Sequence, residues 1–168
     1  MEQLLQPEQE KIEEAIAFLG RFSSVILATV TDSGEPLCSY APCINDGSHY
    51  YVYVSSLAQH AHTLPNGQAS LLFIENEEQA KNVFARRRLS LDCRTSIVDR
   101  QSADHERLLD RMEAAHGSTL KLLRSLPDFI LFSLTPGDAR FVTGFGAAYD
   151  FSGVLPQLLE GASIRNRG

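Results

Sequence analysis

The tripeptide Asn45–Gly47 (Asn-Asp-Gly) separates two β-rich runs and is the strongest hairpin signal in the chain. Asp-Gly accepts the positive φ angles of a tight turn, so we expect the flanking runs, 35–44 and 49–54, to pair antiparallel. A third β-rich run, 24–31, precedes them and ends in the turn signal Asp32–Gly34. Three successive strands with short turns predict an antiparallel meander and not a parallel Rossmann sheet.

The remainder of the chain adds more short strands and a few helices. Strands are predicted at 69–75, 89–98, 128–134 and 140–143, and helices at 7–19, 58–64 and 103–116. Ser102 is a favourable N-cap for the last helix, and Gly117 marks its end. Six or more antiparallel strands interrupted by helices predict a small barrel with α insertions.

Composition limits the possible partners. The 168 residues fit one domain, and the net charge of −6 gives no surplus of Lys and Arg for binding nucleic acid or an anionic membrane surface. No apolar run approaches the roughly 20 residues of a membrane span. The first residues resemble no signal peptide. We therefore expect a cytoplasmic protein.

The three cysteines, Cys38, Cys43 and Cys93, are odd in number and form no C-x-x-C pair, so the sequence encodes neither a disulfide framework nor a zinc site. We expect buried, unreactive thiols. His60 and His62 lie two positions apart and would point in different directions on a helix, so they cannot share a metal ion. No metal site is predicted.

The segment Ser55–His60 marks the change from a strand to a short helix. A helix N-terminus exposes unpaired N–H groups that favour a phosphate, and Ser55, Ser56, Gln59 and His60 could add side-chain donors. The structural alternative is that Ser55 or Ser56 only caps the helix.

The run Arg86–Arg88 is a basic cluster in an acidic chain. On a strand, Arg86 and Arg88 project from one face, where two guanidinium groups could bind a phosphate or a ring carbonyl. Arg87 would point to the other face. The structural alternative is a charged edge strand that discourages aggregation.

A third candidate site combines Phe141 with the turn Gly144–Gly146 (Gly-Phe-Gly). Glycine lets the backbone approach a flat ligand, and a Phe ring can stack on it, although a plain turn beside a core Phe is the alternative. Asp128 could be a partly buried carboxylate that orients a neighbouring donor, although a turn carboxylate is the commoner alternative. The sequence holds no nucleophile–base motif, which argues against a hydrolase, and no catalytic residue is assigned.

Motifs spread over most of the chain, from about residue 24 to 149, resemble the pyridoxamine 5′-phosphate oxidase-like split-barrel superfamily and, within it, the haem-utilisation branch of HugZ/HutZ-type proteins. They occur in the same order as in that branch. The segments that carry the resemblance are 39–42, 55–64, 69–72, 85–91, 128–129 and 141–149.

The resemblance implies a mainly β (α+β) fold, a six-stranded antiparallel split barrel with flanking helices that forms a homodimer. It also implies FMN at the subunit interface. We expect an N-terminal helix at 1–20, the split-barrel domain at 21–155 and a C-terminal tail at 156–168. The cofactor-binding residues carried over are Ser39, Ser55, Ser56, Gln59, His60, Arg86, Arg88, Phe141, Gly144, Phe145 and Gly146.

Two departures from the family pattern bear on function. Gln59 and His60 stand where pyridoxamine phosphate oxidases have Arg and Lys, which argues against vitamin B6 oxidation. Haem-handling relatives place an iron-ligating His shortly after a Glu-Gly step, but Glu160–Gly161 is followed by no histidine. The leading hypothesis is therefore an FMN-binding, oxidoreductase-like protein linked to haem utilisation. The alternatives are a haem-binding or haem-degrading protein and a cofactor-free dimeric binding module.

Overall fold

The computed structural model describes residues 6–152, and its elements alternate between strands and short helices. The strands are β1 (Ser24–Val30), β2 (Pro36–Asn45), β3 (Tyr50–Ser55), β4 (Gln68–Ile74), β5 (Arg88–Ile97), β6 (Phe129–Gly144) and β7 (Ala147–Phe151). The α-helices are α1 (Gln6–Leu19), α2 (Gln59–Thr63), α3 (Ala103–His116) and α4 (Ser118–Arg124). Short 3₁₀ turns are η1 (Leu64–Asn66), η2 (Glu77–Gln79) and η3 (Val83–Ala85). No helix within residues 6–152 has the length and apolarity needed to cross a membrane.

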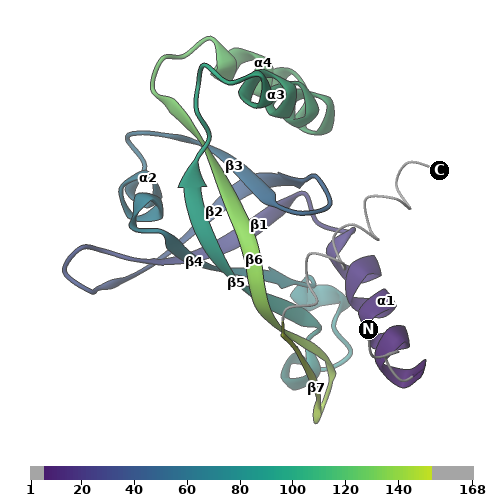
Figure 1. Cartoon of the computed structure of the whole chain (residues 1–168). Helices are drawn as coiled ribbons and strands as arrows, with labels where there is room; N and C mark the ends of the chain where they lie inside the picture. Colours follow the sequence, from purple (N-terminus) through teal and green to yellow (C-terminus); the bar gives the residue numbers. More distant parts are fainter. Residues whose placement is uncertain (1–5, 153–168) are drawn as a thin grey trace.

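The strands form a closed barrel. Within residues 6–152 they make one antiparallel sheet in the order β3-β2-β1-β4-β5-β6-β7, and β3 pairs also with β6. This last pairing joins the two ends of the first six strands, while β7 continues beyond the barrel as a hairpin with β6 (Figure 1). The predicted six-stranded antiparallel split barrel is confirmed.

Most elements predicted from local sequence signals begin and end within one or two residues of the bounds in the structure. The turn at Asn45–Gly47 joins β2 to β3, with Asn45 opposite Tyr50 in the register. Helix α3 starts after Ser102, whose hydroxyl accepts the backbone N–H of His105 at 3.2 Å. It ends before Gly117, whose φ of 77° lies in the region that favours glycine.

The prediction of two separate strands at 128–134 and 140–143 is wrong, because β6 runs unbroken through the intervening residues. Pro136 lies opposite Cys93, where the register between β5 and β6 shifts. Such a bulge tolerates a proline that has no N–H to donate. At Gly137, a Cβ atom would lie 3.3 Å from the Asp92 carbonyl oxygen, so glycine allows the two backbones to approach closely.

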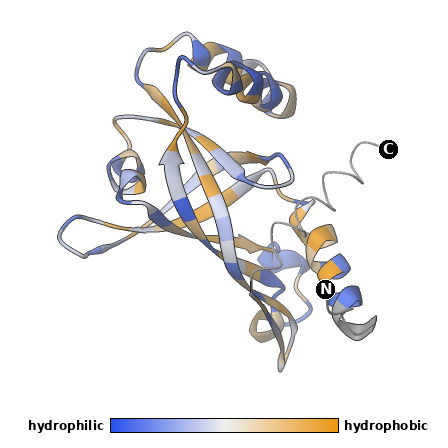
Figure 2. Cartoon of the chain, viewed as in Figure 1, coloured by the Kyte–Doolittle hydropathy of each residue, from blue (hydrophilic) through white to orange (hydrophobic). Residues whose placement is uncertain are grey.

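The barrel core is the cluster of buried residues enclosed by the strands and α1. Figure 2 shows hydrophobic and hydrophilic residues alternating along the strands, as expected when one face of each strand is buried. Helix α1 contributes Ile12, Ile16 and Leu19 from one face, as the sequence pattern predicts. The N-terminal helix therefore shares its core with the barrel.

The helical-hairpin core is a second cluster, which α3 and α4 form against β3 and β6. Its buried members are Tyr51, Tyr53, Leu108, Leu109, Met112, Leu120 and Leu131. Figure 1 shows both helices at the end of the barrel away from the β6–β7 hairpin. Helix α4 is not predicted from the sequence, because it is a short helix after Gly117 with one buried side chain, Leu120.

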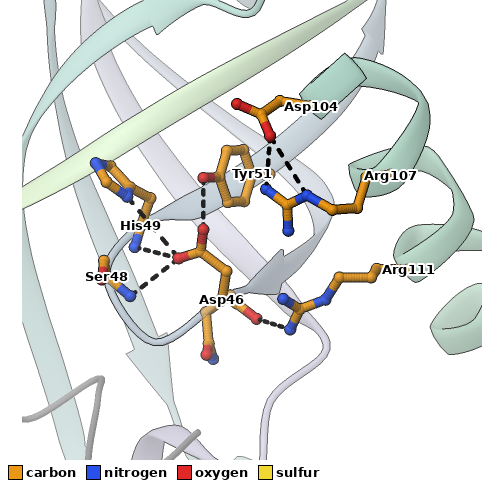
Figure 3. A network of polar contacts seen from close by, with 8 residues as sticks. Asp46, Ser48, His49, Tyr51, Asp104, Arg107 and Arg111 are labelled. Carbon is orange, nitrogen blue, oxygen red and sulfur yellow. Dashed lines mark hydrogen bonds and ion pairs between the residues drawn. The ribbon is translucent and has the colours of Figure 1, made fainter.

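A polar network fastens α3 to the β2–β3 turn (Figure 3). The Asp46 carboxylate accepts the Tyr51 hydroxyl at 2.7 Å and the backbone N–H of His49 at 2.8 Å. From α3, the Arg111 guanidinium donates to the Asn45 carbonyl oxygen at 3.0 Å. Burial would raise the pKa of Asp46, but the hydrogen bonds that its carboxylate accepts lower that pKa overall.

The cysteines differ in exposure. Cys43 and Cys93 are buried free thiols, as predicted, and burial raises the pKa of each to about 12. Cys38 is exposed, so the prediction of three buried thiols is wrong at this position. Cys38 and Cys43 lie five positions apart on β2 and therefore point to opposite faces of the sheet.

Candidate functional site

The end of β3 is held to the start of β6 by a tight set of hydrogen bonds. The Ser55 hydroxyl donates to Asp128 Oδ2 at 2.8 Å and accepts the Leu57 N–H at 3.2 Å. The backbone N–H of Ser56 donates to the Asp128 carbonyl oxygen at 2.7 Å. Of the two alternatives for Asp128, the structure thus supports the carboxylate that orients a hydroxyl donor.

Neither serine caps helix α2. The N-cap residue is Ala58, and no side chain accepts a hydrogen bond there. The capping alternative for Ser55 and Ser56 is therefore wrong. The helix itself has five residues, and Gln59 at its start is exposed to solvent.

The helix-side cavity lies between the barrel and the α3–α4 hairpin and has a volume of about 260 Å³. Most of its wall is apolar, and of the predicted residues Ser55 and His60 line it. The lining residues are Tyr40, Ala41, Pro42, Tyr53, Val54, Ser55, His60, Met112, His116, Thr119, Leu120, Leu123 and Phe129. An apolar pocket with a few convergent polar groups is typical of a small-molecule site.

Two histidines in the helix-side cavity differ in how they are held. Nε2 of His116 lies 3.0 Å from the Cys43 carbonyl oxygen. Because a carbonyl oxygen only accepts hydrogen bonds, Nε2 of His116 carries the hydrogen. The His60 ring makes no hydrogen bond within residues 6–152, and burial lowers the pKa of His60, which favours a neutral imidazole.

The loop-side cavity lies on the other side of Tyr40 and has a volume of about 280 Å³. It is lined by Phe22, Ser24, Val25, Ile26, Tyr40, Leu72, Phe73, Ile74, Asn76 and Arg86. Tyr40 lines both cavities and is 62% exposed. Strand alternation could have marked it, because an outward-facing aromatic residue within a strand suggests a binding surface.

Arg86 and Arg88 do not share a strand as predicted, because β5 begins at Arg88. Arg86 precedes β5 and enters the loop-side cavity, where its Nε donates to the Glu75 carbonyl oxygen at 2.7 Å. Arg88 donates to the Arg86 carbonyl oxygen at 2.9 Å. Arg87 points away from both, forms an ion pair with Glu14 at 2.9 Å and covers the Phe18 ring.

Ser39 faces the barrel interior. It is paired with Leu27, which is fully buried, and cross-strand partners share a face. Its hydroxyl oxygen is shielded from solvent and has no hydrogen-bond partner within residues 6–152. Ser39 and Tyr40 therefore lie on opposite faces of β2.

The remaining predicted residues lie away from both cavities. Phe141 is fully buried in the barrel core, with its ring centroid 5.3 Å from that of Phe18. Gly144, Phe145 and Gly146 form the turn between β6 and β7, and Phe145 is 83% exposed. The described residues of this one chain thus bring together Ser55 and His60, with Arg86 on the other side of Tyr40.

Comparison with known proteins gives the family. The sequence profile of the family described as pyridoxamine 5′-phosphate oxidase matches residues 12–143. The haem oxygenase HutZ of Vibrio cholerae is 39% identical over 154 residues, which is 88% of each chain. The chain belongs to this family and to its HutZ-type branch.

Solved structures agree with this assignment. A crystal structure of Vibrio cholerae HutZ, described as a haem storage protein, has a TM-score of 0.66 and 36% identity, covering 80% of this chain and 91% of HutZ. Campylobacter jejuni ChuZ has a TM-score of 0.76 and 31% identity, covering 92% of this chain and 63% of ChuZ. Both structures are similar to the split-barrel fold described above.

Proposed function

We propose that this protein binds haem and acts in haem utilisation. The observation that carries the proposal is the 39% identity to a haem oxygenase over nearly the whole chain. The helix-side cavity supports it, because an apolar wall with two imidazoles suits a flat apolar ligand that contains iron.

The residues around Tyr40 fit the parts of a haem. The apolar side chains Leu120, Leu123 and Phe129 suit the porphyrin ring, and the Arg86 guanidinium in the loop-side cavity suits a propionate carboxylate. Neither cavity alone reaches the 300–1000 Å³ that is common for ligand pockets. We infer that the ligand lies across both. Haem, when bound, would supply the iron at which oxygen is activated, and the chain would bind and orient it.

A second copy of the chain would complete this site. Tyr40 lies opposite Ile26, and Ile26 lies opposite Leu72, so three apolar side chains form a row on the outer face of the barrel. The exposed Tyr40 in this row makes it a suitable surface for a partner. We infer a homodimer that uses this row. Ile26→Asp should convert the dimer to a monomer in light scattering, and a wild-type monomer would contradict the inference.

FMN is the second candidate ligand, and it fits the family profile. The electrostatics at the predicted phosphate position argue against it. The Asp128 carboxylate lies 2.8 Å from the Ser55 hydroxyl that was expected to hold the phosphate. A carboxylate beside a phosphate is unfavourable, and the carboxylate already occupies the serine donor.

Titration with each ligand tests the proposal. Haemin added to the purified protein should give a defined absorbance band that saturates at one haemin per chain. FMN fluorescence should show little quenching by the wild type and more by Asp128→Asn, which removes the negative charge. Saturable FMN binding without haemin binding would support the flavoprotein instead. If neither ligand bound, the cofactor-free binding module would be favoured.

A further inference from the structure

Haem iron takes an axial ligand from His, Cys, Met or Tyr. The sequence holds five His, three Cys, two Met and five Tyr, and none of these lies in 153–168. Every such donor except Met1 therefore belongs to the described residues. Five of them line the two cavities that share Tyr40: Tyr40, Tyr53, His60, Met112 and His116.

Two of these five are too enclosed to meet an iron atom. Met112 is 1% exposed and Tyr53 is 6% exposed, and both pack in the helical-hairpin core. Bringing either donor to a ligand would require opening that core. Tyr40 is accessible, but it would have to lose its phenolic proton to bind iron, whereas a neutral imidazole already has a free lone pair.

The two histidine rings differ in their hydrogen bonds. Because His116 donates its Nε2–H to the Cys43 carbonyl oxygen, it could bind iron only through Nδ1, in the ring orientation that this hydrogen bond fixes. His60 is not constrained in this way, because its ring has no hydrogen-bond partner within residues 6–152 and it lines the cavity from α2. His60 shares the wall of this cavity with Ser55, whose hydrogen bond to Asp128 fixes the strand end that leads into α2.

We propose that the ring of His60 is the axial ligand of the haem iron in this protein. The inference rests on the proposed haem-binding function and names the residue that makes the metal bond. It assigns the iron side of the ligand to the helix-side cavity. Arg86 then lies on the other side of Tyr40, in the loop-side cavity, where the carboxylates would be expected.

The test compares His60→Ala with His62→Ala in the full chain. His62 is two residues further along α2, exposed, and does not line either cavity, so it is a matched control. Haemin titrations followed by absorbance should show at least a tenfold loss of affinity and a shifted Soret band for His60→Ala. Added imidazole should restore the wild-type band in His60→Ala, and His62→Ala should behave as the wild type.

The outcomes distinguish failure of the proposed haem-binding function from failure of the His60 assignment. If the wild type fails to saturate with haemin, the proposed function itself is wrong. If the wild type saturates and His60→Ala keeps the same band and affinity, His60 is not the ligand although the function stands. Loss of affinity that imidazole does not restore would indicate a structural role, and loss of the band in His116→Ala alone would assign the ligand to His116. Either result would overturn the inference.

Discussion

The barrel core and the helical-hairpin core differ in how completely they are packed. The barrel core is enclosed by a closed ring of paired strands, and Leu27, Leu71, Leu89, Leu91, Phe132 and Phe141 in it are fully buried. The helical-hairpin core is smaller and rests on one side of β3 and β6, and the helix-side cavity opens between it and the barrel. Well-packed interiors leave few voids, so a ligand site belongs where two packed bodies meet. The closed barrel holds the larger core, and its junction with the hairpin holds the helix-side cavity.

The largest expected loss of stability comes from a substitution in the barrel core. Phe141→Ala should lower the free energy of unfolding by about 4 kcal/mol, because it removes a fully buried aromatic ring and leaves a cavity. Urea denaturation followed by circular dichroism measures this change. Phe145→Ala is the control, because the Phe145 ring is 83% exposed and its loss should change stability little. A stable Phe141→Ala variant that had lost haemin binding would instead assign Phe141 to the site.

A smaller effect is expected in the helical-hairpin core. Leu120→Ala should lower the unfolding free energy by about 2 kcal/mol, at the low end for a buried leucine, because the site adjoins an existing cavity. Hydrogen exchange should show faster opening of α3 and α4 with little change in β4 and β5. Equal acceleration throughout the barrel would mean that the two cores unfold as one unit.

The start of α3 provides a third test of the hairpin. Ser102→Ala removes the side chain that accepts the His105 N–H and should cost about 1 kcal/mol of stability. Ser118→Ala is the control, because Ser118 follows the N-cap residue Gly117 and no side-chain cap bond is present in α4. Thermal denaturation compares the two, and equal losses would contradict a capping role for Ser102.

The smallest effect concerns pH. Burial lowers the pKa of His105, while Glu106 and Asp99 nearby oppose this and Arg100 and Arg124 add to it. A histidine whose pKa is lower in the folded state binds its proton more readily when unfolded, so stability should fall as pH decreases from 7 to 5. His105→Gln should reduce this pH dependence of the unfolding free energy, and exposed His62→Gln should not. An unchanged slope in His105→Gln would show that His105 contributes nothing to it.

The sequence predicted the parts of the fold that local chemistry determines. The Asn45–Gly47 turn and the Ser102 cap are short-range signals, and both lie where they were expected. The unbroken β6 was missed because residues 135–138 include Pro136 and Gly137, which normally indicate a turn. A bulge against β5 accommodates them, and such a bulge depends on a partner strand that local sequence does not reveal.

The candidate site was less predictable because it depends on which face each side chain takes. Ser39 and Tyr40 are neighbours, yet one faces the barrel interior and the other lies between two cavities. The sequence indicated His60 but not its cavity partner His116, which comes from α3 and lies 56 residues further along the chain. Arg86 and Arg88 were expected to project together from a strand, but Arg86 precedes β5 and bonds to a backbone carbonyl oxygen.

The pairing of β3 with β6 makes completion of the barrel a late event in synthesis. Tyr50 in β3 pairs with Leu134 in β6, so more than eighty further residues must be synthesised before this partner is available. During that interval β3 and β5 each present an open edge of backbone donors and acceptors to neighbouring nascent chains. Fragments that end before β6 should therefore aggregate, and expression of this protein should depend on how quickly translation passes through the last third of the message.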